Sequence, residues 1–193
     1  LGDQFLVAFG AGAVQLWVAL PAASKDVSPH FEHHGVLPKI EINEISVNLF
    51  MGSWLGHTSG ATTYTPIIGA EITGGAVNTV LNIDKSFEYG ILLDQGEVKI
   101  NGKEVKTSQL HYMPAGETEF KLESNGEFRA LLIGGEPFDE EIIMWWNFIG
   151  RSHDEIVAMR NDWESQSTRF AKFEDKIGGR IPAPELPNLM LKP

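Results

Sequence analysis

The sequence predicts an all-β sandwich or barrel. From Ile40 onward, short strand-like segments follow one another with turn residues between them and without a helical period. Residues 87–120 show the pattern best, because apolar and polar side chains alternate and so place one row toward a core. Asn101-Gly102 separates two such runs, and this dipeptide is the strongest short-range hairpin signal because a type I′ turn needs positive φ at both positions.

The composition is that of an acidic globular protein. The 193 residues are enough for one substantial core or two small domains. The net charge of −11 argues against direct nucleic-acid binding, which requires clustered Lys and Arg. The chain has no cysteine, which excludes disulfides and thiolate metal ligands. Neither a membrane-spanning apolar run nor a signal-peptide pattern is present, so we expect a cytoplasmic protein without a membrane partner.

Two strands are expected near the start of the chain. Residues 4–9 and 14–20 are apolar, the turn Gly10-Ala11-Gly12 separates them, and Pro21 ends the second because proline cannot donate to a sheet ladder.

The segment 22–38 is expected to connect elements rather than to pack as one. It contains His30, His33 and His34, and neutral imidazole is the commonest metal ligand. A metal site and a solvated loop are both possible interpretations; the lack of a regular element that would aim the three rings at one point favours the loop.

The character of the sequence changes after the last expected strands. Residues 142–149 form an aromatic-rich apolar run, and Ser152 is followed at capping-box spacing by Glu155, which predicts the start of a helix. Ile156, Met159 and Trp163 form one face of that helix, which we expect to lie against the barrel. A proline-rich extended tail should follow.

Residues 131–156, LLIGGEPFDEEIIMWWNFIGRSHDEI, resemble the signature of the pirin family. Two further segments are similar to pirin sequences: VQLWVALPAASK at 14–25 resembles the segment that joins the two halves of a pirin, and the tail 180–193 resembles the proline-rich ending of bacterial pirins. The resemblance implies a cupin-type double-stranded β-helix, that is, a jelly-roll barrel, followed by a helix and an extended tail. It also implies a bicupin parent whose iron or other divalent metal is held by the N-terminal cupin.

The resemblance divides the chain into four parts. Residues 1–21 resemble the end of an N-terminal cupin, 22–39 form a linker, 40–150 form the C-terminal cupin barrel, and 151–193 form the helix and the proline-rich tail. The metal ligands of the family are therefore expected outside this chain, and no cofactor is expected within it.

A metal-binding cupin places an H-x-H pair on one strand, a Glu a few residues later, and a His after a P-x-G corner. Read backward from Gly96, the Glu position falls on Tyr89, and the H-x-H positions fall on Asn82 and Asp84 or on Ile83 and Lys85. The corner is present as residues 114–116, but its His position holds Glu119. No metal ligand or catalytic residue is therefore expected.

Two interpretations of this barrel remain. In one, apolar side chains fill its interior and it supports a partner barrel. In the other, a metal-free pocket for a small polar ligand is lined by the following candidates: Asn82, Asp84, Tyr89, His111 and Glu119. A carboxylate that faced a barrel interior would need a partner or solvent, which gives the pocket some support.

For function, we expect a pirin-like cupin protein that is structural or regulatory and binds a protein or small-molecule partner, or forms a homodimer. The exposed candidate for a protein contact is the acidic loop 136–141 with the adjacent Trp145 and Trp146, whose other interpretation is packing against the helix. The alternative is a part of a metal-dependent quercetinase-type dioxygenase whose metal ligands lie in an N-terminal barrel.

Overall fold

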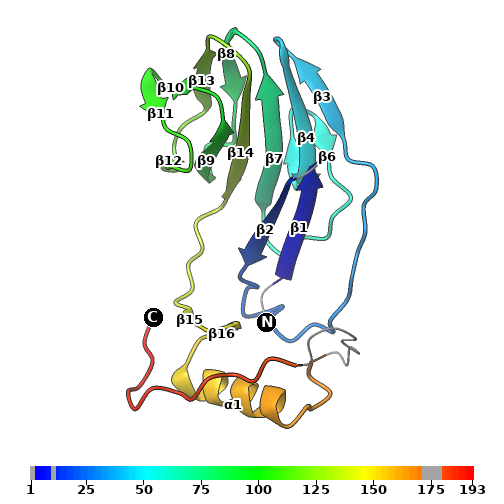
Figure 1. Cartoon of the computed structure of the whole chain (residues 1–193), viewed down its shortest axis with the longest axis vertical. Helices are drawn as coiled ribbons and strands as arrows, with labels where there is room; N and C mark the ends of the chain where they lie inside the picture. The colour runs from blue at the N-terminus through cyan, green and yellow to red at the C-terminus, as the bar shows by residue number, and fades with distance from the viewer. Residues whose placement is uncertain (1–2, 10–11, 171–179) are drawn as a thin grey trace. The chain divides into compact units, whose positions relative to one another are not determined.

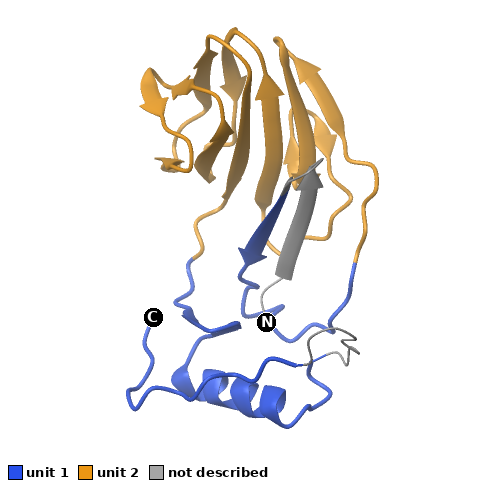
Figure 2. Ribbon diagram, in the orientation of Figure 1, with its two compact units in different colours: residues 1–31, 139–193 blue, residues 32–138 orange. Residues whose placement is uncertain are grey.

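The computed structural model describes residues 3–9, 12–170 and 180–193, and Figure 1 traces the chain. The residues fall into two compact units, coloured separately in Figure 2. Unit 1 comprises residues 1–31 and 139–193, and unit 2 comprises residues 32–138. The sequence-based boundaries at residues 21, 39 and 150 stay predictions.

Unit 2 consists of antiparallel strands, which confirms the all-β cupin fold. Its two main sheets have the strand orders β11-β10-β13-β8 and β12-β9-β14-β7-β4-β3, and a two-stranded β5-β6 hairpin accompanies them. The strands are β3 (Lys39–Ile42), β4 (Ile45–Met51), β5 (Ser53–Trp54), β6 (His57–Thr58), β7 (Ile67–Gly74), β8 (Val77–Asn82), β9 (Glu88–Gln95), β10 (Val98–Ile100), β11 (Lys103–Val105), β12 (Leu110–Met113), β13 (Glu119–Ser124) and β14 (Phe128–Gly135).

The core of unit 2 is built by alternation along the strands. In β8, Val77, Thr79 and Leu81 are buried while the residues between them are exposed. The same alternation buries Phe120 and Leu122 of β13, which pair with Leu81 and Thr79. These inward rows form one continuous apolar core with residues of the six-stranded sheet.

The turns of unit 2 follow from local sequence. Asn101 and Gly102 have φ values of 50° and 76°, which confirms the tight turn that the sequence predicts. Gly96 has φ 87°, and a Cβ at this position would lie 2.3 Å from the carbonyl oxygen of Glu127. Only glycine fits there.

The described residues of unit 1 form two hairpins and one helix. The strands β1 (Asp3–Phe9) and β2 (Gly12–Val18) pair as the sequence predicts, although residues 10–11 of the expected turn lie outside the described residues. The second hairpin consists of β15 (Ile143–Trp145) and β16 (Phe148–Gly150). It leads into α1 (His153–Glu164).

The N-terminus of α1 has one of the two hydrogen bonds of the expected capping box. The Ser152 Oγ accepts a hydrogen bond from the Glu155 amide at 3.2 Å. The reciprocal bond of a capping box is shifted by one residue, because Glu155 Oε2 accepts from the amide of Arg151 at 2.7 Å. The Glu155 carboxylate therefore secures the chain just before the helix.

The apolar face of α1 packs within unit 1. Ile156 and Met159 are buried in a cluster with Ile143, Phe148 and Ala183. We expected this face to lie against the barrel, but its described contacts are with the β15–β16 hairpin and the C-terminal tail. The tail is extended, as predicted. Its bonds to the helix include Arg160 Nε to Pro184 O, Trp163 Nε1 to Ile181 O, Ala183 N to Glu164 Oε1, Leu191 N to His153 Nδ1, and those of the Arg180 guanidinium to Trp163 O and Glu164.

Among the described residues, no helix combines the length and the hydropathy that crossing a bilayer would take.

Candidate functional site

The inward row at the end of β8 consists of apolar residues. Leu81 is 1% exposed and Ile83 is 9% exposed, whereas Asn82 and Asp84 between and after them are exposed. Asn82 and Asp84, the first candidate H-x-H pair, therefore lie on the outer row. Of the second candidate pair, Ile83 and Lys85, only Ile83 points inward. A register shift of one residue moves every side chain of a strand to the opposite face of the sheet. The spacing from Gly96 did not determine which of the two registers β8 has.

Tyr89, which the sequence pattern predicts at the Glu position of a metal-binding cupin, points into the core with 2% exposure. Its hydroxyl donates to the Asp84 carbonyl oxygen at 3.2 Å and accepts from the Asp84 amide at 2.9 Å. Burial raises the pKa of the phenol, so the hydroxyl stays protonated and able to donate. The Tyr89 hydroxyl therefore holds the main chain in place at Asp84.

The remaining two candidates lie apart from Tyr89's hydroxyl. Glu119 is exposed and pairs with Asn82 on the outer row of the four-stranded sheet. His111 is half-buried on β12 and pairs with the buried Ile91, so it lies on the inner face of the other sheet. Burial, and secondarily the charge of Lys103, lowers the pKa of the His111 imidazole.

The donor set of the interior does not suit a metal ion. Iron and related divalent metals take imidazole and carboxylate ligands, and the corresponding inner positions here carry Leu81, Ile83, Tyr89 and Phe120. Within the described ranges, no three His, Asp or Glu side chains converge as metal ligands would. No step of chemistry at a metal is therefore derived for this interior.

An open hollow of about 550 Å³ lies where the end of β8 meets the β5–β6 hairpin. The hairpin lines it with residues 53–58, and the end of β8 with the two residues after it contributes Asn82, Ile83 and Asp84. Two of the five predicted pocket residues, Asn82 and Asp84, are thus brought together. Tyr89 touches the hollow only through its bonds to Asp84, and neither His111 nor Glu119 is among the lining residues.

Hydrogen bonds fix the Asn82 main chain and the Asp84 carboxylate at the rim of this hollow. The Trp54 indole Nε1 donates to the Asn82 carbonyl oxygen at 2.8 Å. Asp84 Oδ1 accepts from the Ser86 amide at 2.9 Å and from the Ser86 hydroxyl at 2.7 Å. The amide bond, followed by the hydroxyl bond, lowers the pKa of the Asp84 carboxyl, so a negative charge is present on the rim at neutral pH.

Sequence reasoning missed the hairpin half of the hollow. A signal was available, because Leu55-Gly56 separates the two short strands and both residues have positive φ, 49° and 80°. Glycine at the second position is typical of such a two-residue hairpin turn. That Trp54 would reach β8 across 28 residues of sequence had no local signal.

The histidine segment is an exposed loop. His34 Nε2 lies 3.1 Å from Glu32 Oε2, and Glu32 also accepts from the amide and the hydroxyl of Thr62 at 3.0 and 2.5 Å. These bonds tie the segment to residues 59–62 of unit 2. The solvated-loop interpretation matches this placement.

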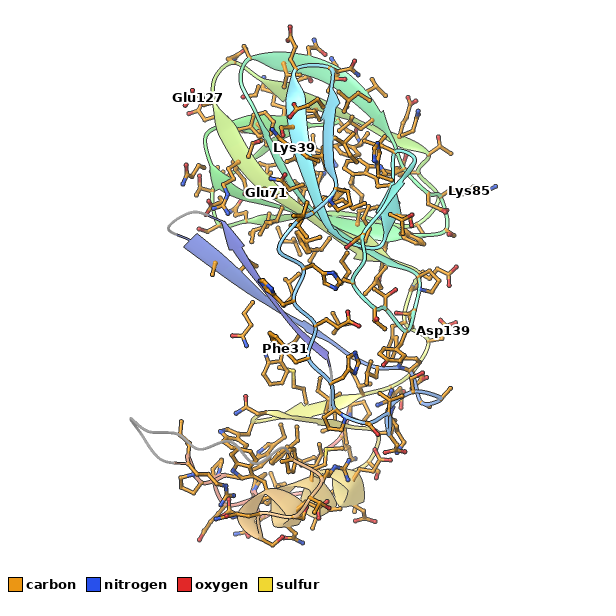
Figure 3. The ribbon with its side chains drawn as sticks, turned by 90° about the vertical axis from the view of Figure 1, so that its right-hand side faces the viewer. Phe31, Lys39, Glu71, Lys85, Glu127 and Asp139 are labelled. Carbon is orange, nitrogen blue, oxygen red and sulfur yellow. The ribbon has the colours of Figure 1, made fainter. Side chains whose placement is uncertain are left out.

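A buried charge network lies on the outer face of the six-stranded sheet, where Figure 3 labels Glu71. Glu71 is 5% exposed and accepts from Arg129 Nε at 2.6 Å and from Asn48 Nδ2 at 2.8 Å. Arg129 also bonds to Asp94 Oδ2 at 2.7 Å. This network links four consecutive strands of the six-stranded sheet, in the order β9, β14, β7 and β4.

Comparison with known proteins gives consistent matches. The Pirin C-terminal cupin domain matches residues 73–171. A Pseudomonas aeruginosa protein named as a candidate quercetin 2,3-dioxygenase is 35% identical over 92% of this chain and 56% of its own length. A pirin-like protein of Caulobacter vibrioides is 30% identical over 89% of this chain and 59% of its own length.

A solved structure is also similar. The quercetin 2,3-dioxygenase from Acinetobacter baumannii superimposes with a TM-score of 0.87 at 34% identity, over 92% of this chain and 60% of that one. The chain therefore spans little more than half the length of the relatives that it matches.

Proposed function

This chain belongs to the pirin family, and on that premise we propose that unit 2 is a metal-free cupin half that acts as a scaffold and binding module rather than as a catalytic centre. The observation that carries the proposal is the filled interior. Leu81, Ile83 and Phe120 occupy inner positions at the end of the barrel, and Tyr89 ties its ring to the main chain there. A side chain that closes the core cannot at the same time leave room for substrate.

Metal analysis tests this proposal. The purified chain is incubated with Fe(II), Ni(II) or Zn(II), dialysed, and measured by mass spectrometry. The matched control is the double variant His33→Ala/His34→Ala, which removes exposed imidazoles that could hold metal at the surface. We expect less than one ion per chain in the wild type and less still in the control. One tightly held ion per chain in both proteins contradicts the proposal.

A second candidate function is a share in dioxygenase activity. The Pseudomonas and Acinetobacter relatives carry quercetin 2,3-dioxygenase names, which supports a parent protein of that type. In this alternative, the metal ligands lie in a further barrel and this chain contributes only support. Dioxygen uptake with quercetin tests this alternative on the bicupin parent: it expects uptake by the metal-loaded parent and none by this chain, whereas a metal-loaded parent without uptake leaves only the scaffold role, and uptake by this chain alone contradicts both candidates.

A protein partner or a second copy of the chain is part of the same proposal. Within the acidic loop 136–141, Glu140 already bonds to the amide of Ala22 and to Arg151, which lowers the pKa of its carboxyl. Trp146 contacts Phe148 and Trp163 edge-on, which favours packing over an exposed interface. Light scattering tests self-association, and a concentration-independent monomer mass argues against the homodimer.

A further inference from the structure

The hollow beside the end of β8 has the composition of a small-molecule site. It holds about 550 Å³, which lies within the usual range for ligand pockets, and such sites occur at the mouths of β-barrels. Trp54, Leu55 and Ile83 supply apolar surface, whereas the hairpin and the segment after β8 supply hydroxyl, amide and carboxylate groups. An apolar floor with a few polar groups is the typical arrangement.

The polar groups of the hollow are fixed before any ligand arrives. Asn82 is held through its carbonyl oxygen by the Trp54 indole, and Asp84 is held through both main-chain groups by Tyr89. The hydroxyls of Ser53 and Thr58 lie 2.9 Å apart and share one hydrogen bond across the hairpin. Preorganised groups bind with a smaller loss of conformational entropy than mobile ones.

The charge of the hollow points to a cation. Asp84 is the one carboxylate among the described lining residues, and no Lys or Arg accompanies it there. Both Ser86 bonds go to Oδ1 in the described contacts, which leaves the Asp84 Oδ2 able to accept a hydrogen bond from a ligand. An anion would be repelled by this negative charge and is disfavoured.

We propose that this hollow binds a small ligand that combines an apolar ring with an ammonium group, with the ring against Leu55 and Ile83 and the ammonium group beside the Asp84 carboxylate. The site lies outside the filled interior and goes beyond the proposed scaffold role. Its failure would leave that role untouched, because neither the apolar inner row nor the metal analysis depends on a ligand here.

The test uses three probes of nearly equal shape on the wild-type chain: 2-phenylethylammonium, 2-phenylethanol and 3-phenylpropionate. Amide chemical shifts report both the location and the affinity. We expect the ammonium probe to shift the amides of residues 53–58 and 82–84, and to bind about fivefold more tightly than the alcohol, the upper end for an exposed charge pair. The carboxylate probe should bind most weakly.

Two variants complete the test. Asp84→Asn removes the charge but keeps an oxygen for Ser86, and should make the ammonium and alcohol affinities equal. Glu127→Gln is the control: this exposed carboxylate lies far from the hollow, as its position relative to Lys85 in Figure 3 shows, and should change neither affinity. Shifts elsewhere only, equal binding of all three probes by the wild type, or an unaltered preference in Asp84→Asn overturns the proposal.

Discussion

The hydroxyl of Tyr89 bonds to both main-chain groups of Asp84, as donor to the carbonyl oxygen at 3.2 Å and as acceptor from the amide at 2.9 Å. The ring of Tyr89 thus packs in the core, and its hydroxyl anchors the main chain just after β8. It joins the filled interior to the rim of the hollow through one side chain.

Tyr89→Phe should keep the core packed and lose both bonds. We expect the free energy of unfolding to fall by about 1 kcal/mol, because the part-buried Asp84 amide loses its partner while the Asp84 carbonyl oxygen keeps its bond from the Phe87 amide. Urea unfolding measures the change. Tyr112→Phe is the matched control, since Tyr112 lies exposed on the edge strand β12 and the loss of its hydroxyl bond to Glu88 should have no measurable effect. Equal effects of the two variants would contradict the anchor role.

Arg129→Met should destabilise unit 2 by leaving Glu71 buried without its cation. We expect about 2 kcal/mol, below the usual 3–5 for a fully buried pair, because the Arg129 side chain is 20% exposed. The double variant Arg129→Met/Glu71→Gln should recover part of the loss, which urea unfolding of all four proteins would show as a coupling energy.

Lys121→Met is the control for that cycle, because its pair with Glu123 is 43% and 29% exposed and should contribute little. Strict additivity of the Arg129 and Glu71 substitutions would show that the network does not act as a unit.

Trp163→Ala should loosen unit 1. Its ring meets Trp146 and Phe170 edge-on at 5.7 and 5.3 Å, Arg180 lies 4.7 Å above it, and its indole donates to Ile181 O. We expect a loss of about 2–3 kcal/mol for this half-buried ring. Limited proteolysis should then cleave the tail near residues 180–193 much faster.

Met144→Ala is the matched control, since this side chain lies in the same unit, on the β15–β16 hairpin, but is 64% exposed. Proteolysis at the same rate in Trp163→Ala and Met144→Ala would show that the aromatic cluster does not hold the tail.

His111 should make stability depend on pH. Because burial lowers its pKa in the folded protein, the unfolded chain binds more protons below the ordinary imidazole value of about 6.5. The free energy of unfolding should therefore fall as the pH drops from 7.5 through 6.5 and below. Urea midpoints of the wild type and His111→Gln over this window test the point: the variant should lose that part of the slope, and parallel slopes would refute the assignment.

Much of the fold was predictable because its signals are local. Alternation along β8 and β13, the Asn101-Gly102 turn and the Ser152 cap each depend on neighbours within a few residues, and the structure has all three. Family resemblance extended these signals to the cupin topology, which alternation alone left open between sandwich and barrel.

The site was harder to predict because it depends on register and on distant contacts. One residue of offset decides whether Leu81 or Asn82 faces inward, and counting from Gly96 across a loop cannot supply that precision. Glu71 and Arg129 are 58 residues apart, and meet only because β7 and β14 are neighbours. The local sequence around Glu71 or Arg129 therefore does not indicate which residue each will contact.

The central claim is that apolar side chains fill the barrel interior where other cupins hold a metal. The most direct test adds Co(II) to the chain with ¹³C-labelled Ile and Leu methyl groups and records paramagnetic shifts. We predict that the methyl signals of Leu81, Ile83 and Ile91 keep their positions, and that any methyl groups that shift lie near exposed histidines. Large shifts centred on these three interior methyl groups, at one ion per chain, would contradict the account.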